Sequence, residues 1–150
     1  MLMNYELRPA EILLVEDNLG DVRLIEEALK DSKLLNNLNV VSDGIYAMDF
    51  LHKRNGYENS PTPDLILLDL NMPRKNGFEV LHEIKQDEKL KSIPVVIMTV
   101  SNDEKDILKS YNLHANCYIT KPVDFMQFCE IVRHIENFWF SIVTLPKRKE

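Results

Sequence analysis

Hydrophobic positions along the chain alternate between short unbroken runs and longer stretches with helical spacing. The runs predict strands, because a strand covered on both faces has a continuous apolar sequence. Each run is followed by a stretch whose apolar residues recur every three or four positions, which predicts an amphipathic helix. The pattern predicts an α/β protein of five strand–helix units, with a parallel sheet covered by helices on both faces. The expected strands are 12–15, 38–41 (the weakest), 65–68, 95–98 and 117–119.

Capping residues and apolar faces support the predicted helices. Asp43 can cap a helix over 45–54, and Asn102 or Asp103 can cap another. A further helix is expected after Gly77. The first and last helices are expected from residues that share one face: Val22, Ile25, Ala28 and Leu29 in the first, and Phe128, Ile131, Val132, Ile135, Phe138 and Trp139 in the last.

Polar residues lie just after four of the predicted strands, within two positions of the strand end. Glu16 and Asp17 come after the first strand, Asp69 after the third, Thr99 after the fourth and Lys121 after the fifth. Taken alone, Asp69 could simply open a turn, since aspartate is a common turn residue. However, the carboxyl ends of parallel strands meet at one edge of an open α/β sheet, where functional groups gather. The spacing therefore predicts that these five side chains share one site.

The residue types at this edge suit phosphoryl transfer. Three carboxylates in one cleft repel one another unless a cation is present, and Mg²⁺ prefers oxygen ligands. A plain acidic patch is the alternative for Glu16, Asp17 and Asp69, but Lys121 at the same edge argues against it. Beside a metal and a lysine, Asp69 could act as a nucleophile and form an acyl phosphate. The hydroxyl of Thr99 could then donate a hydrogen bond to the new phosphoryl group.

Length and composition limit the class of protein. The chain has 150 residues, enough for one domain, with 45% hydrophobic and 28% charged residues. A net charge of −6 argues against a nucleic-acid binder, which usually carries a basic face. No signal peptide or run of membrane-spanning length is found, and Cys117 and Cys129 form no Cys-x-x-Cys pair. A cytoplasmic protein without membrane or nucleic-acid partners is expected.

Several short motifs, in this order and spacing, resemble the response-regulator receiver domain of two-component signalling. The resemblance runs from about residue 11 to about residue 138. It rests on these residues: Glu16 and Asp17, Asp69 with Pro73 and Gly77, Thr99 thirty positions after Asp69, and Tyr118 before Lys121 and Pro122. It implies a flavodoxin-like (βα)5 fold, a doubly wound parallel sheet of strand order 2-1-3-4-5. The implied division is a lead over 1–10, one receiver domain over 11–138 and a C-terminal extension over 139–150.

The resemblance also implies roles for individual residues. Asp69 would accept a phosphoryl group from a sensor histidine kinase. Asp17 would bind Mg²⁺ directly, Glu16 through water, and Asn71 through its backbone carbonyl; Asp69 is the further expected ligand. The expected switch pair is Thr99 and Tyr118, and the expected cis peptide joins Lys121 to Pro122. Two positions depart from the usual pattern: Val100 stands where alanine is common, and His114 where glycine is common.

Three consecutive aromatic residues near the end of the chain predict an interface. One side of a helix cannot bury Phe138, Trp139 and Phe140 together, because they project about 100° apart. They could instead fold back onto the domain, but aromatic residues are enriched at interfaces, so a homodimer is expected. This ending, the stretch "HANCYITKP" and the loop over 55–63 are similar to stand-alone regulators paired with cyanobacterial phytochromes. A phytochrome-like kinase is therefore an expected partner.

The sequence is interpreted as a signalling protein that has no output domain and is not an enzyme, and two other functions are the alternatives. An aspartate-nucleophile phosphohydrolase of the haloacid dehalogenase type would need a second aspartate two positions after Asp69, as general acid and base. Asn71 occupies that position and cannot fill this role. A flavodoxin-like cofactor binder would share the fold but would need no acidic triad.

Overall fold

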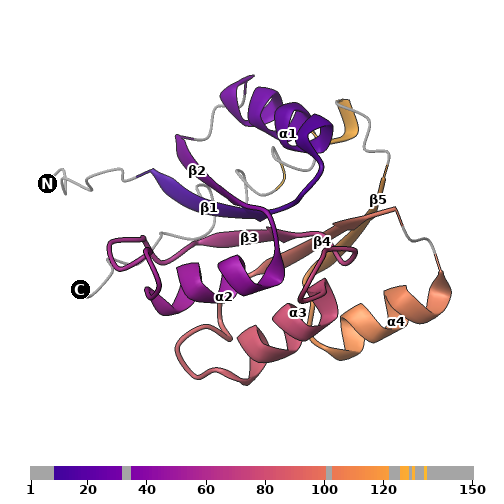
Figure 1. The fold of residues 1–150 in the computed structure, drawn as a ribbon. Helices are drawn as coiled ribbons and strands as arrows, with labels where there is room; N and C mark the ends of the chain where they lie inside the picture. Colours follow the sequence, from indigo (N-terminus) through magenta and orange to yellow (C-terminus); the bar gives the residue numbers. More distant parts are fainter. Residues whose placement is uncertain are drawn as a thin grey trace, which may run out of the picture.

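The computed structural model describes residues 9–31, 35–100, 103–121, 126–128, 130 and 134. Five parallel strands form one sheet in the order β2-β1-β3-β4-β5, which confirms the expected fold (Figure 1). The strands are β1 (Ala10–Val15), β2 (Asn36–Val41), β3 (Leu65–Leu68), β4 (Val95–Thr99) and β5 (Cys117–Thr120). The helices are α1 (Leu19–Asp31), α2 (Gly44–His52), α3 (Gly77–Gln86) and α4 (Glu104–Asn112). No helix in these described ranges is long and apolar enough to cross a membrane.

Helices cover both faces of the sheet, so the central strands are apolar on both sides. In Figure 1, α1 lies on one face and α2, α3 and α4 lie on the other. All four residues of β3 are buried, as its continuous apolar run predicts. Successive residues of this strand belong to two different clusters, Leu65 and Leu67 to the one under α1, and Ile66 and Leu68 to the one under α2 and α3.

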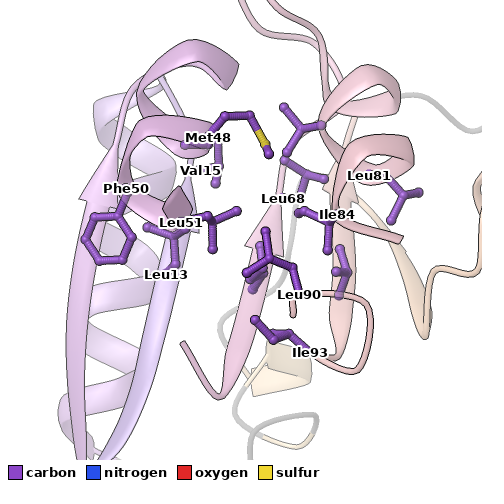
Figure 2. Close-up of a cluster of buried hydrophobic side chains, with 14 of the residues drawn as sticks. Leu13, Val15, Met48, Phe50, Leu51, Leu68, Leu81, Ile84, Leu90 and Ile93 are labelled. Carbon is purple, nitrogen blue, oxygen red and sulfur yellow. The ribbon is translucent and has the colours of Figure 1, made fainter. Parts of the chain in front are cut away.

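The larger cluster packs α2 and α3 against the sheet. Figure 2 shows Leu13 and Val15 of β1 beside Leu51 of α2, and Leu68 of β3 beside Ile84 of α3. Complete burial of one such side chain contributes about 1.5–3 kcal/mol relative to exposure. This packing makes the sheet a rigid base for the loops that follow its strands.

The strand register brings the ends of three strands together. Val15 pairs with Leu68, and Leu68 pairs in turn with Ile97. The backbone N–H of Asp69 donates to the carbonyl of Val15 at 3.0 Å. Glu16 and Asp69 therefore leave the sheet side by side, at the point where the strand order reverses.

A glycine allows the start of α3 to approach the end of β3. A Cβ atom at Gly77 would lie 2.3 Å from the carbonyl oxygen of Asp69, a distance that no side chain tolerates. The N–H of Gly77 donates to the carbonyl of Leu70 at 3.0 Å. The loop after Asp69 is thus closed tightly by the first residue of α3, whose cap is Asn76.

Helix α4 is the least buried of α1 to α4, the helices that the structure describes from end to end. Ser110 is its one fully buried residue among those described, whereas Leu108 is 63% exposed and Tyr111 is 47% exposed. The helix begins after Asp103, one of the two expected caps. His114 beyond its end has φ of 69°, a left-handed conformation that explains why glycine is common at this place.

The expected last helix is described only in part. Residues 126–128, 130 and 134 are helical, and Phe128 is buried in the cluster under α1. Pro122 and the three aromatic residues 138–140 lie outside the described residues. The cis peptide and the aromatic interface therefore stay predictions.

Candidate functional site

Three carboxylates meet at the carboxyl edge of the sheet. Glu16, Asp17 and Asp69 each offer an oxygen within 4.8 Å of the others. Glu16 and Asp69 are buried, at 2% and 6% exposure, while Asp17 is exposed. This arrangement confirms that the three acidic residues singled out by their position after strands share one site.

Lys121 lies in the same site and is shared by several carboxylates. Its ammonium donates to Glu16, to Asp21 Oδ2 at 2.8 Å and to Asp69 Oδ2 at 3.5 Å. Its backbone N–H donates to the carbonyl of Thr99, which joins the ends of β4 and β5. One buried cation is therefore placed among residues from β1, α1, β3 and β4.

Burial and charge shift the protonation of two groups. Burial raises the pKa of Glu16 to about 7, opposed by hydrogen bonds from Lys121 and the Asn18 N–H and assisted by the charge of Asp69. Burial would lower the pKa of Lys121, but hydrogen bonds to Asp21 and Glu16 and the charge of Asp69 outweigh it and raise that pKa. Lys121 therefore stays protonated, and Glu16 is sensitive to any further positive charge brought near it.

The donor set fits a hard divalent ion. The site holds one ammonium and four carboxylates, those of Glu16, Asp17, Asp21 and Asp69, so it carries a net −3 when all are ionised. A divalent cation reduces this to −1. All the available ligand atoms are oxygens, which Mg²⁺, Mn²⁺ and Ca²⁺ prefer.

Asn71 links the acidic cluster to Thr99. Its backbone N–H donates to Asp69 Oδ1 at 3.1 Å, and its side-chain Nδ2 donates to Thr99 Oγ1 at 3.0 Å. Thr99 is completely buried. Tyr118, the other expected switch residue, is half-buried on β5 and packs against the cluster under α2 and α3.

The structure adds one residue to the site that the sequence analysis missed. Asp21 lies in the first turn of α1, where acidic residues favour the helix dipole, and its N–H donates to Asn18 Oδ1 at 3.0 Å. An acidic residue three positions after asparagine at a helix start is readily interpreted as part of a cap. Its contact with Lys121, one hundred positions away, had no signal in the local sequence.

A second ion pair lies beside the loop that carries Asn71. Asp43 caps α2 as expected, accepting from the Tyr46 N–H at 2.9 Å, and it also accepts from Arg74 Nε at 2.9 Å. The guanidinium of Arg74 lies 4.7 Å from the centre of the Tyr46 ring. Arg74 has φ of 63°, so a strained residue of the β3–α3 loop is held against the start of α2.

The fold and the site together are typical of a receiver domain, and comparison with known families agrees. A family model described as the response regulator receiver domain matches residues 12–133. The chain therefore belongs to the response regulator receiver domain family.

Within this family the chain is similar to phytochrome response regulators. Response regulator Rcp1 of Synechocystis sp. is 52% identical over 138 residues, which span 92% of this chain and 94% of Rcp1. The structure of the phosphorylated cyanobacterial phytochrome response regulator RcpA is 51% identical, with a TM-score of 0.82 over 93% of this chain and 100% of that chain. The bacteriophytochrome response regulator RtBRR is 40% identical, with a TM-score of 0.76 over 95% of this chain and 84% of that chain.

These likenesses define the protein as a signalling protein, a receiver-domain response regulator related to the phytochrome response regulators. A structure of Rcp1 with bound Mn²⁺ is 52% identical, with a TM-score of 0.81 over 93% of this chain and 100% of that chain. That structure and the acidic cluster of this chain are both consistent with divalent metal binding.

Proposed function

We propose that Asp69 is the phosphoacceptor of this response regulator and that its partner is a phytochrome-type sensor histidine kinase. The observation that carries the proposal is the buried carboxylate of Asp69, within 4.8 Å of two further carboxylates and 3.5 Å from the ammonium of Lys121. In the proposed reaction a carboxylate oxygen of Asp69 attacks the phosphorus of a phosphohistidine. The P–N bond breaks, the imidazole leaves and takes up a proton, and an acyl phosphate forms on Asp69.

The proposed metal is Mg²⁺, held by Glu16, Asp17, Asp69 and the backbone carbonyl of Asn71. When bound, the ion supplies positive charge to the phosphoryl oxygens in the transition state. Lys121 is proposed to hold another of these oxygens, and the hydroxyl of Thr99 to donate to the product phosphoryl group. The contact between Asn71 and Thr99 supports this assignment, because it keeps the Thr99 hydroxyl close to Asp69 before reaction.

The signal is proposed to leave the domain through protein contacts. Movement of Thr99 toward the phosphoryl group would free space for Tyr118, and the exposed face of α4 lies next to β5. We further propose that the receiver domain spans residues 11–138 and is cytoplasmic, and that it forms a homodimer through α4, the last helix and the aromatic residues 138–140. Sedimentation of the wild type and of Trp139→Ala, each with and without a phosphoryl mimic, tests the dimer. A wild type that is monomeric in both states would contradict it.

The phosphoacceptor is tested by intact mass measurement after treatment with acetyl phosphate and Mg²⁺. Wild type should gain one phosphoryl group, and Asp69→Asn should gain none, because the amide is not a nucleophile. Asp17→Ala is the matched variant: it keeps the acceptor and removes a metal ligand, so it should be phosphorylated more slowly and bind Mg²⁺ weakly. Full phosphorylation of Asp69→Asn would overturn the assignment.

A further inference from the structure

Lys121 is closer to a carboxylate outside the acidic triad than to the acceptor itself. Its ammonium lies 2.8 Å from Asp21 Oδ2 and 3.5 Å from Asp69 Oδ2. The Lys121 side chain is only 5% exposed, so it depends on these partners rather than on water. Asp21 is 32% exposed and takes part in no oxygen cluster with Glu16, Asp17 and Asp69. The lysine therefore lies on the side of the site formed by Glu16 and Asp21, and its shortest contact, at 2.5 Å, is to Glu16.

The start of α1 fixes the place of Asp21. Glu16 Oε1 accepts from the N–H of Asn18, and Asn18 Oδ1 accepts from the N–H of Asp21, each at 3.0 Å. These two bonds connect the end of β1 to the first turn of α1. The Asp21 carboxylate is therefore held on a rigid element at the edge of the site, and it does not depend on a mobile loop.

This placement reduces the competition between the Lys121 ammonium and a divalent ion for the same carboxylates. Glu16 and Asp69 accept from Lys121, and the same two carboxylates belong to the group that fits a divalent ion. Without another partner, the ammonium would occupy oxygens that the metal needs and would repel the metal at short range. Asp21 offers the ammonium a carboxylate that the metal does not use.

We propose that Asp21, together with Glu16, is a positioning residue that holds Lys121 farther from Asp69 in the unphosphorylated protein, so that the carboxylate of Asp69 remains open to a divalent ion. The inference rests on the proposed function. A phosphoryl group on Asp69 adds charge and acceptor oxygens beside Lys121. The ammonium then exchanges Asp21 for these oxygens. Asp21 therefore favours the metal-bound, unphosphorylated form and competes with the phosphoryl group for the lysine.

The first test measures Mg²⁺ affinity by NMR titration of the full chain without a phosphodonor. Asp21→Asn should weaken Mg²⁺ binding by roughly three- to tenfold, since the freed ammonium stays with Glu16 and Asp69 and one nearby charge is lost. Glu27→Gln is the matched control, because it removes the same charge from an exposed position of the same helix. It should leave Mg²⁺ affinity close to that of wild type. Equal affinity of Asp21→Asn and wild type would overturn the proposal.

The second test asks whether Asp21 acts through Lys121. In a Lys121→Met background, Asp21→Asn should change Mg²⁺ affinity much less than it does in the wild type, because no ammonium remains to be redirected. An undiminished effect would show that Asp21 acts only by its own charge and would overturn the positioning role. Asp21→Glu gives an independent test that remains valid even if Lys121→Met does not fold. This variant keeps the carboxylate, so it should retain most of the Mg²⁺ affinity that Asp21→Asn loses. Failure of Asp21→Glu in a folded protein to recover any affinity would also count against the proposal.

The third test follows the lifetime of the phosphorylated protein. Asp21→Asn should lengthen it relative to Glu27→Gln, because Lys121 no longer has a competing carboxylate. An unchanged or shorter lifetime would contradict the competition. Failure of the proposed function would give a different result, because Asp69→Asn would then be phosphorylated like the wild type. That result does not depend on the Mg²⁺ titrations of the Asp21 variants.

Discussion

Two clusters of charged side chains border the segment that follows β3, and they are built in different ways. In the first, Lys121 is buried and shared by three carboxylates, so positive charge is in short supply. In the second, Arg74 pairs with Asp43 alone among the acidic residues that the structure describes, and the Arg74 side chain is 48% exposed. The first cluster has more negative than positive charge, whereas the charges of the second cluster balance within the protein. The difference teaches that a buried cation shared by several carboxylates is typical of a site that can bind a metal ion. A one-to-one ion pair, in contrast, is typical of a contact that only stabilises the fold.

The largest effect on this comparison is expected from Lys121→Met. Removing the ammonium leaves buried carboxylates without their cation, and loss of one partner in a buried ion pair costs about 3–5 kcal/mol in the free energy of unfolding. Added Mg²⁺ should restore part of this loss, because the ion binds the folded state and should stabilise the variant, which lacks a buried cation, more than it stabilises the wild type. Urea unfolding with and without Mg²⁺ measures both quantities.

The pH dependence of Lys121→Met serves as its control. The pKa of Glu16 is raised by burial to about 7 in the folded wild type, above its ordinary value of 4.5, so the folded state holds a proton there that the unfolded state has lost. The contribution of Glu16 to stability is therefore present below pH 4.5 and is lost as pH rises to about 7. The cost of Lys121→Met should accordingly be larger at pH 8 than at pH 5. A cost that is the same at both pH values would contradict the account of this cluster.

A smaller effect is expected from Asp43→Ala in the second cluster. This change removes the cap of α2 and the partner of Arg74, and loss of an N-cap costs about 0.5–2 kcal/mol. Asp43→Asn should cost less, because asparagine caps a helix about as well as aspartate. Mg²⁺ should stabilise the Asp43 variants as much as it stabilises the wild type, so their losses relative to the wild type should not shrink, in contrast to Lys121→Met. A loss of Asp43→Ala relative to the wild type that shrinks with Mg²⁺ in the same urea experiment would remove the distinction between the two clusters.

The smallest effect is expected from Arg74→Ala. The arginine side chain is about half exposed, so solvent screens its pair with Asp43, and such pairs contribute about 0–1 kcal/mol. The change should nevertheless slow phosphorylation of Asp69 modestly, since Arg74 holds the loop that carries Asn71 against α2. Thermal unfolding and the rate of phosphorylation by acetyl phosphate check the two expectations. A loss of stability as large as that of Lys121→Met would show that the Arg74–Asp43 pair behaves like the buried ion pairs of Lys121.

The features of this molecule that depend on the order of residues within short segments were predictable from the sequence. The buried strand β3 was predictable from four consecutive apolar residues, and Glu16, Asp17, Asp69, Thr99 and Lys121 from their positions just after strands. Such residues meet because parallel strands share one carboxyl edge, which requires no knowledge of side-chain packing.

Contacts made from helices and loops were not predictable in the same way. Asp21 reaches Lys121 from the first turn of α1, and Arg74 reaches Asp43 across 31 positions. Both pairings depend on how α1 and the β3–α3 loop pack on the sheet. The poor burial of α4 also depends on packing, since its apolar residues Leu108 and Tyr111 lie on the exposed side of the helix.

Helix α4 has a consequence for how relatives of this protein can diverge. Its only fully buried residue among those described is Ser110, and its exposed positions carry almost none of the packing that holds the fold. Substitutions at such positions change stability by about 0.5 kcal/mol or less. Duplicated copies of the gene could therefore alter this surface freely while the acidic triad and the sheet stay the same. The proposed contact surface and the acidic triad lie on separate parts of one small domain, so substitutions can change the first without disturbing the second.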